Sequence, residues 1–341
     1  MARMTAGATL TTTLVELDVY GLGVAVATEW EEVLGAVRGD FAWFERRPVG
    51  AELNLSIERR PPEFSAFSDL KPSFVTPRNV VYQSSERTVI DYFGAALSIY
   101  DRAQDSLLVQ GENPHLVHEA SYHFLLSRIG EHLDAIGMPR LHALGLAGSD
   151  GAVAVLLPGG GGKTTLALRA LRDDRARLLS DDSPLIDRRG RLHPFPLRLA
   201  VNPEQAAELP PGNVRRMERM ELHPKLLLDL DGYRDRIESA SQPLRHIVIG
   251  ERSLGGDARL ERVPRRAAIG PLLREAVIGV GLYQGMEFVL QHGAIDVARQ
   301  ARPALVRGAC CAAGLARASV WRLTVGRNHD HNWNALQRLL A

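Results

Sequence analysis

The chain has 341 residues, of which 45% are hydrophobic and 24% are charged, a balance typical of globular proteins rather than disordered ones. Its 41 basic and 40 acidic residues give a formal net charge of +1, which argues against a general electrostatic affinity for nucleic acid or for membranes. The length allows two domains of ordinary size.

The first residues and the cysteines indicate the compartment. The segment MARMTAGATLTTTLVELDVYG lacks the apolar core of a signal peptide, and no run approaches the ~18 apolar residues that span a bilayer. Cys310 and Cys311 are neighbours, which rarely form a disulfide, and no metal-ligand spacing surrounds them. We therefore expect two small buried helix residues there, and a soluble, cytoplasmic protein.

Short strand patterns dominate residues 1–110. A helix-like segment, EWEEVLGAVRGDFAWF, separates the first of these patterns from the second. The strand candidates are LVELDVYGLGVAVA, AELNLSIE, NVVYQSS, TVIDYFG, ALSIYD and SLLVQG. The sequence thus predicts a β-rich N-terminal domain over 1–110, suited to binding a substrate or a partner.

The period of the apolar residues changes at GENPHLVHEASYHFLLSRIGEHLDAIG. Asn113 is a favourable N-cap, Pro114 suits the first helical position, and Gly137 ends the pattern. This predicts a helix of about twenty residues. We place the domain boundary just before it, so that residues 111–341 form the second domain.

Strands and helices alternate in this second domain, which predicts an α/β fold. Strands are expected over 141–146, 152–157 and 177–179, with a helix over 163–171 and a hairpin around Arg189 and Gly190. Further expected elements are strands at KLLLDL, RHIVIGE, ARLERV and VWRLTVG and helices over 267–291, 294–314 and NWNALQRLL.

The segment AVAVLLPGGGGKTTLALRAL has the composition of a phosphate-binding loop. Gly159, Gly160, Gly161 and Gly162 would let backbone N–H groups approach phosphate oxygens, Lys163 supplies a cation, and Thr164 and Thr165 open the following helix. The hydroxyl of Thr164 is suited to Mg²⁺. The pattern G-x-x-x-x-G-K-[ST] is not met, because Leu157 stands at its first glycine. A flexible glycine linker is the alternative, although a linker does not normally join an apolar strand to an amphipathic helix.

A pair of carboxylates follows the next apolar strand, in RARLLSDDSPLID. Asp181 and Asp182 lie 18 and 19 residues beyond Lys163. One carboxylate at a strand end can hold Mg²⁺, and its neighbour can accept a proton from a hydroxyl acceptor. The alternative is an Asp-Asp turn that only ends the strand.

These segments, LHALGLAGSDGAVAVLLPGGGGKTTLALRAL and LLSDDSPLIDRRGRLHPFPLRLAV, resemble the kinase domain of the HPr kinase/phosphorylase-related proteins, whose core is similar to that of phosphoenolpyruvate carboxykinase. The resemblance covers roughly 115–341 and is sharp over about 140–200. It implies a phosphate-loop kinase domain with a mixed sheet, in which Gly159–Thr165 hold the nucleotide. It further implies that His142 lies near the active site, that Asp181 serves the acceptor hydroxyl, and that Asp182 lies nearer the metal.

Two more basic residues are candidates for contact with the phosphate or the acceptor. HPKLLLDL resembles a later segment of the family whose lysine faces the site, which implies a role for Lys225. Arg198 follows the rigid segment HPFPL and is a candidate on chemical grounds, a plain sheet-edge segment being the alternative.

The sequence therefore predicts an ATP- and Mg²⁺-dependent kinase that phosphorylates a hydroxyl of a peptide, protein or small metabolite. The N-terminal region differs from that of the true HPr kinases, so we expect an acceptor other than HPr. A nucleotide hydrolase coupled to a partner and a non-catalytic nucleotide-binding module are the alternatives. The expected partners are thus the nucleotide and the acceptor, without nucleic acid or membrane, and the sequence is compatible with a homo-oligomer.

Overall fold

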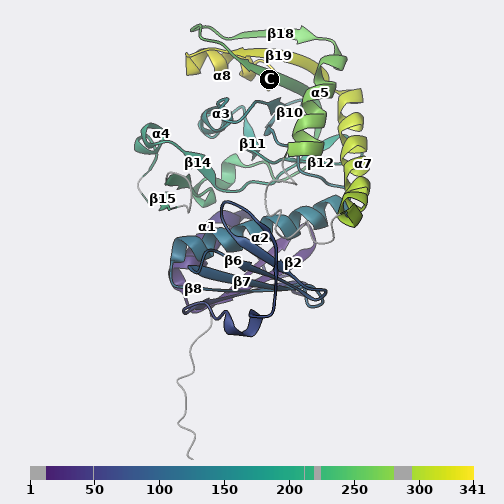
Figure 1. The fold of residues 1–341 in the computed structure, drawn as a ribbon. Helices are drawn as coiled ribbons and strands as arrows, with labels where there is room; N and C mark the ends of the chain where they lie inside the picture. The colour runs from purple at the N-terminus through teal and green to yellow at the C-terminus, as the bar shows by residue number, and fades with distance from the viewer. Residues whose placement is uncertain (1–12, 49, 211, 219–223, 280–293) are drawn as a thin grey trace, which may run out of the picture. The chain divides into compact units, whose positions relative to one another are not determined.

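The computed structural model describes residues 13–48, 50–210, 212–218, 224–279 and 294–341. The chain forms two compact units (Figure 1). The first consists of Met1–Gly39, Phe44–Tyr122 and Glu218–Pro224, and the second of Asp40–Trp43, His123–Met217 and Lys225–Ala341. The division after Tyr122 falls inside a continuous helix, later than the boundary expected before residue 111.

The first unit is β-rich, as the sequence predicts. Its eight-stranded sheet has the order β1-β2-β3-β8-β7-β6-β5-β4. β2 pairs in parallel with β3, and β3 with β8, whereas the other neighbours are antiparallel. The connection between the parallel strands β2 and β3 contains helix α1, because parallel strands need a crossover. The bounds are β1 (Thr13–Val19), β2 (Leu22–Thr28), α1 (Glu31–Phe41), β3 (Leu53–Arg59), β4 (Pro72–Val75), β5 (Val80–Gln83), β6 (Arg87–Asp91), β7 (Ala96–Asp101) and β8 (Ser106–Gly111).

The predicted long helix is α2 (Pro114–Ala135). The Asn113 side chain accepts hydrogen bonds from the backbone N–H groups of His115 at 3.0 Å and Leu116 at 3.2 Å. Gly137 follows the helix with φ of 79°, a conformation that glycine adopts without strain. Both ends of the helix are thus where the sequence predicts them.

The second unit is built on a mixed sheet of order β11-β9-β10-β17-β13-β12, which β19 and β18 extend beside β17. β10, β17 and β19 are parallel, and β11, β9 and β10 are joined antiparallel. β12 and β13 form the predicted hairpin, with Gly190 at φ of 68°. The bounds are β9 (Leu144–Gly148), β10 (Gly151–Leu156), β11 (Arg177–Ser180), β12 (Leu185–Ile186), β13 (Arg191–His193), β17 (Gln242–Arg252), β18 (Arg259–Val263) and β19 (Ser319–Val325).

A small antiparallel sheet of order β14-β16-β15 also belongs to the second unit. The helix predicted over 267–291 is a 3₁₀ turn, a short α-helix and a π-helical segment as far as Gly279, and the rest of that range lies outside the described residues. The remaining bounds are α3 (Lys163–Ala170), β14 (Leu199–Val201), α4 (Pro203–Ala207), β15 (Val214–Met217), β16 (Lys225–Leu228), α5 (Ile269–Leu272), the π-helical segment (Leu273–Gly279), α7 (Ala294–Arg317) and α8 (His329–Gln337).

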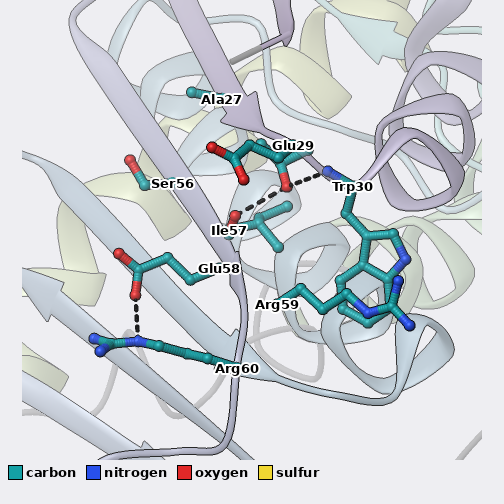
Figure 2. Close-up of a pocket in the computed structure, with 9 residues that line it drawn as sticks. Ala27, Glu29, Trp30, Ser56, Ile57, Glu58, Arg59 and Arg60 are labelled. Atoms are coloured by element: carbon teal, nitrogen blue, oxygen red, sulfur yellow. Dashed lines mark hydrogen bonds and ion pairs between the residues drawn. The ribbon is translucent and has the colours of Figure 1, made fainter. Parts of the chain in front are cut away.

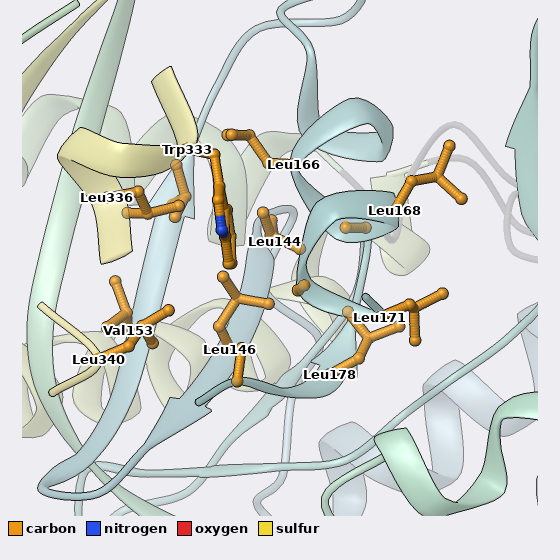
Figure 3. Close-up of a cluster of buried hydrophobic side chains, with 14 of the residues drawn as sticks. Leu144, Leu146, Val153, Leu166, Leu168, Leu171, Leu178, Trp333, Leu336 and Leu340 are labelled. Atoms are coloured by element: carbon orange, nitrogen blue, oxygen red, sulfur yellow. The ribbon is translucent and has the colours of Figure 1, made fainter. Parts of the chain in front are cut away.

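Helices cover both faces of the mixed sheet. Successive residues of a strand point to opposite faces, and those of β10 divide accordingly. Val153 and Val155 belong to a core beneath α3 and α8, in which Trp333 lies among leucines of β9 and α3 (Figure 3). Ala152 and Ala154 belong to a second core shared with residues of α5 and α7. The second unit is therefore a three-layer α/β/α structure.

Cys310 and Cys311 lie on α7 as free, buried thiols, as the sequence predicts. Their exposed fractions are 0% and 6%, and burial raises the pKa of the Cys310 thiol to about 11. Among the helices of the described ranges, none is both long enough and apolar enough to cross a bilayer.

Candidate functional site

The glycine loop, Pro158–Gly162, connects the carboxyl end of β10 to α3. Gly160 and Gly162 have φ of 68° and 101°, and Gly162 is the N-cap of α3. A Cβ built at either of them has no described atom within 4 Å, so the backbone conformation rather than packing requires glycine there. Gly161 donates its N–H to the Pro158 carbonyl at 2.8 Å, which closes the turn. The loop therefore leads into a helix N-terminus that is open to an anion.

Leu157, which replaces the first glycine of the common pattern, is a core residue. Its exposed fraction is 1%. A Cβ built at Gly250 on the neighbouring strand β17 would lie 2.1 Å from Leu157 Cδ2, so the leucine occupies space that glycine leaves free. Leu157 thus follows β10 directly, and the turn that Gly161 closes begins at Pro158.

Lys163 opens α3 and is 8% exposed. Its Nζ donates to the Leu157 carbonyl at 3.0 Å, and lies 2.7 Å from His142 Nε2 and 3.3 Å from Asp182 Oδ1. An ammonium group has three hydrogens, enough for all three contacts when His142 Nε2 carries a lone pair. Three segments, one after β10, one before β9 and one after β11, therefore converge on one cation.

Asp181 and Asp182 follow β11, where Ser180 Oγ accepts the N–H of Ser183 at 3.0 Å and fixes the turn. β11 pairs with β9, which pairs with β10, and this order brings the carboxylates beside the glycine loop. A turn that only ends the strand and a turn that presents functional carboxylates would both have this backbone conformation.

The two carboxylates have different environments. Asp181 is 9% exposed, and burial, with the negative charge of Asp182, raises its pKa, although the charges of Lys163 and Lys225 oppose the rise. Burial would also raise the pKa of Asp182, but the His142 hydrogen bond and the charges of His142 and Lys163 outweigh it and lower that pKa. The side chain of Asp182 is 46% exposed. One carboxyl thus tends to hold a proton while its neighbour stays ionised.

His142 precedes β9 and contacts acids through both ring nitrogens. Nε2 lies 3.0 Å from Asp182 Oδ1, and Nδ1 lies 2.6 Å from Glu275 Oε2. The hydrogen bond with Asp182 is the main cause of the raised pKa of His142. His142 thus lies beside Lys163 and Asp182, and its place in an active site stays a prediction.

Sequence reasoning missed Glu275, which lies 133 residues from His142 in the chain. It is 6% exposed and belongs to the π-helical segment. Its one local sign is a carboxylate within the largely apolar stretch PLLREAVIG. A buried acid of this kind needs a polar partner.

Arg252 was also missed. It ends β17, which pairs in parallel with β10, so both strands finish at the same edge of the sheet. Its Nη1 donates to the Gly160 carbonyl at 3.0 Å, and the residue is exposed. A second cation therefore lies against the glycine loop.

The two threonines after Lys163 differ in their contacts. Thr164 is partly exposed in the first turn of α3. Thr165 Oγ1 accepts a hydrogen bond at 3.0 Å from Gln205, which also completes a capping box with Asn202 at the start of α4. Thr165 thus connects α3 to α4, which leaves Thr164 as the better candidate for Mg²⁺.

Lys225 and Arg198 lie in different surroundings. Lys225 is exposed at the start of β16, and its charge acts on Asp181. Arg198 is paired with Asp40, a carboxylate with a fully buried side chain that also contacts Arg215. The structure therefore places Arg198 in a buried charge network and not in the group around Lys163.

The residues at the loop fit a magnesium–nucleotide complex. No cluster of three or more His, Cys, Asp or Glu side chains suited to a metal occurs among the described residues. Mg²⁺ that is bound with a nucleotide needs only one or two carboxylates, because phosphates and waters complete its shell. Asp182, ionised and half exposed, and the hydroxyl of Thr164 are donors of the right chemistry.

A separate pocket lies in the first unit at the carboxyl ends of β2 and β3, with a volume of about 450 Å³ (Figure 2). Arg59 stacks on the Trp30 ring at 4.9 Å, and Thr28 Oγ1 donates to the Ile57 carbonyl at 2.9 Å. Glu58 and Arg60 form an ion pair of 2.7 Å. The lining of the pocket thus contains acidic side chains, basic side chains and one aromatic ring, a mixture that does not indicate one class of ligand.

Two comparisons with known proteins were without a match for this chain. No protein-family model matches it, and no curated protein matches it. The chemistry of the site is therefore inferred from its own residues.

Proposed function

We propose that this protein is an ATP-dependent kinase that transfers the γ-phosphoryl group to a hydroxyl acceptor. The observation that carries the proposal is the convergence of Lys163 with the Asp181–Asp182 pair at a glycine loop that opens a helix. A cation at a helix N-terminus attracts phosphate, and a buried carboxyl with a raised pKa suits proton transfer.

The nucleotide phosphates are expected on the glycine loop. Backbone N–H groups of residues 159–162 and the N-terminus of α3 offer hydrogen bonds to phosphate oxygens. Lys163 would exchange its contacts with Leu157, His142 and Asp182 for the β- and γ-phosphates. The contacts of Lys163 thus hold its ammonium group beside the expected phosphate site in the absence of nucleotide.

Thr164 and Asp182 would hold the Mg²⁺ that accompanies ATP. The bound ion would neutralise charge on the phosphates. Asp182 suits this role because its pKa is lowered and its side chain is half exposed, so an ionised oxygen reaches solvent.

Asp181 is proposed as the base. Its carboxylate would take the proton of the acceptor hydroxyl while that oxygen forms a bond to the γ-phosphorus. The bond from the γ-phosphorus to the bridging oxygen breaks, and ADP leaves with the electron pair. Positioning and charge stabilisation by Lys163 would supply most of the acceleration.

The expected fold relationship is part of the proposal. Parallel strands β10, β17 and β19, with the loop after β10, support a phosphate-loop domain similar to the phosphoenolpyruvate carboxykinase-like core of HPr-kinase-related proteins. The acceptor would be a hydroxyl of a peptide, protein or small metabolite other than HPr.

Incubation with γ-labelled ATP and Mg²⁺ over a panel of seryl peptides and polyols, followed by mass analysis, tests the proposal. We expect a phosphorylated product with the unaltered protein and about 10²–10⁴-fold slower formation of it with Asp181→Asn. The matched control is Asp235→Asn, which alters an exposed carboxylate on the 3₁₀ turn after β16. Release of phosphate with every acceptor unchanged would instead identify a hydrolase. Binding of ATP with neither release nor transfer would identify a non-catalytic module.

A further inference from the structure

We propose that Glu275 is a positioning residue that holds the imidazole of His142 with a hydrogen on Nδ1, so that Nε2 is the ring atom facing Lys163 and Asp182. The effect of Glu275 on catalysis rests on the proposed kinase function, whereas the position of the hydrogen on the His142 ring is independent of that function.

The contact between the two side chains is short and enclosed. Glu275 Oε2 lies 2.6 Å from His142 Nδ1, and the backbone N–H of His142 donates to the Glu275 carbonyl at 3.2 Å. Two separate hydrogen bonds therefore join the same pair of residues across 133 positions of sequence. A carboxylate only accepts, so Nδ1 must be the donor in this pair.

The second oxygen of Glu275 is also engaged. Arg274 Nε donates to Oε1 at 2.7 Å, and the Glu275 side chain is 7% exposed. The carboxylate is thus fixed from both sides, with one oxygen on arginine and the other on histidine. A group held in this way can orient its partner.

The position of the hydrogen on Nδ1 determines what the other ring nitrogen, Nε2, can donate or accept. Nε2 lies 2.7 Å from Lys163 Nζ and 3.0 Å from Asp182 Oδ1. With the hydrogen on Nδ1, Nε2 offers a lone pair to the ammonium; with a hydrogen on both nitrogens, it donates to Asp182. A neutral ring with its single hydrogen on Nε2 would still donate to Asp182 but would leave Nδ1 without a hydrogen for Glu275, so that bond would be lost. Glu275 therefore keeps His142 between Lys163 and Asp182 in either of the two allowed states.

Replacement of Glu275 by glutamine would reverse this preference. Arg274 can donate only to the amide oxygen, which leaves the NH₂ group toward His142 Nδ1. The neutral ring would then carry its hydrogen on Nε2, against Lys163. The substitution preserves shape, so its effect reports hydrogen bonding rather than packing.

The first measurement is ¹⁵N NMR of the histidine rings in the full chain, with the His142 signals assigned by their loss in His142→Gln. We expect an Nδ1-bound hydrogen in the unaltered protein and an Nε2-bound hydrogen in Glu275→Gln. Glu261→Gln, which alters a partly exposed carboxylate on β18, should leave the spectrum of His142 unchanged. A neutral His142 with its hydrogen on Nε2 in the unaltered protein would overturn the proposal, whether or not the protein is a kinase.

The second measurement is a double-mutant cycle on phosphoryl transfer from ATP–Mg²⁺. We expect Glu275→Gln to lower kcat by about 10- to 100-fold, by analogy with the range seen when hydrogen-bond partners of metal-ligating histidines are changed, with the nucleotide Kd changed less than about twofold. In a His142→Ala background the same substitution should have no further effect, because Glu275 acts through His142. An equal loss in both backgrounds would show a merely structural role and overturn the proposal.

If neither the unaltered protein nor any variant transfers phosphate, the proposed function has failed. The NMR result then decides the position of the hydrogen by itself.

Discussion

Leu157, the residue after β10, and Gly250, on the neighbouring parallel strand β17, are complementary in size. A Cβ at Gly250 would lie 2.1 Å from Leu157 Cδ2, so the two positions cannot both carry large side chains without a shift. This pairing accounts for the leucine at the first position of the glycine loop pattern. The usual glycine is absent there, and the small residue stands on the neighbouring strand instead.

Gly250→Ala should therefore be destabilising and should disturb the loop. Overpacking of this kind costs about 1–3 kcal/mol in the free energy of unfolding, measurable by denaturant titration. Gly256→Ala is the matched control, because no described atom lies within 4 Å of its built Cβ. The double variant Gly250→Ala with Leu157→Ala should be less destabilised than the sum of the two single changes. Strict additivity would contradict the complementarity.

Lys163→Ala should weaken ATP binding. The lysine is expected to form charged hydrogen bonds to the phosphates, and such bonds contribute about 1.5–3 kcal/mol, or roughly 10- to 150-fold in Kd. Calorimetric titration of ATP–Mg²⁺ measures the change, with Lys71→Ala in the first unit as the control. An unchanged Kd would separate Lys163 from nucleotide binding.

The transfer rate should rise with pH above the usual carboxyl range, because Asp181 must be ionised to accept a proton and its pKa is raised in the folded protein. Asp181→Asn should lower the rate by about 10²–10⁴-fold, the contribution typical of a general base, and should flatten the pH profile. An Asp181→Asn enzyme that keeps the original rate and profile would exclude Asp181 as the base.

The same raised pKa has a consequence for stability. The folded protein retains a proton on Asp181 that the unfolded chain releases. The stabilising contribution of this proton to the free energy of unfolding is therefore full below the pKa of Asp181 in the unfolded chain, and it is lost as pH rises through the raised pKa of the folded protein. Asp181→Asn should therefore gain stability relative to the unaltered protein at alkaline pH. Thermal unfolding at a series of pH values measures the difference.

Arg252→Ala should lower the affinity for ATP with little effect on stability. Arg252 is exposed and donates to Gly160, so its loss frees the glycine loop and removes a cation beside the expected phosphates. Arg245→Ala is the control on the same strand, since Arg245 instead donates to the Asp150 carbonyl at 3.2 Å. Equal nucleotide affinities in the two variants would show that Arg252 plays no part in binding.

Asp173 stabilises the contact between α3 and α8. Burial would raise its pKa, but hydrogen bonds from the Arg175 backbone and from Gln337 and Trp333 outweigh burial and lower the pKa to about 2. Its contribution is present above the unfolded pKa and is lost as pH falls from about 4 to about 2. We expect Asp173→Asn to lower the free energy of unfolding by about 2 kcal/mol at neutral pH and to make that free energy less dependent on pH in this window. Trp fluorescence during unfolding measures both effects. An unchanged acid transition would contradict the assignment.

Much of the site was predictable because its residues are close in sequence. The glycine loop, Lys163 and the Asp181–Asp182 pair each follow an apolar strand, and the strand order β11-β9-β10 brings them together with His142. The β-rich N-terminal region and the ends of α2 were predictable for the same reason, since alternation and capping residues are local.

The missed residues depend on tertiary contacts. Glu275 meets His142, and Gly250 and Arg252 meet the loop, only because β17 pairs with β10 and the segment after α5 packs near β9. Arg198 pairs with Asp40, 158 residues upstream, a partner that nothing in its own segment indicates. The pattern over 267–291 favoured one helix, but the 3₁₀, α and π pieces before Gly279 show that apolar spacing does not specify the helix type.

The most direct test of the kinase proposal is mass analysis of hydroxyl acceptors after incubation with γ-labelled ATP and Mg²⁺, with Asp181→Asn and Asp235→Asn run in parallel. The account predicts that label moves to an acceptor hydroxyl with the unaltered protein and Asp235→Asn, and moves about 10²–10⁴-fold more slowly with Asp181→Asn. Transfer by Asp181→Asn at the unaltered rate, or label that appears only as inorganic phosphate across the acceptor panel, would contradict it.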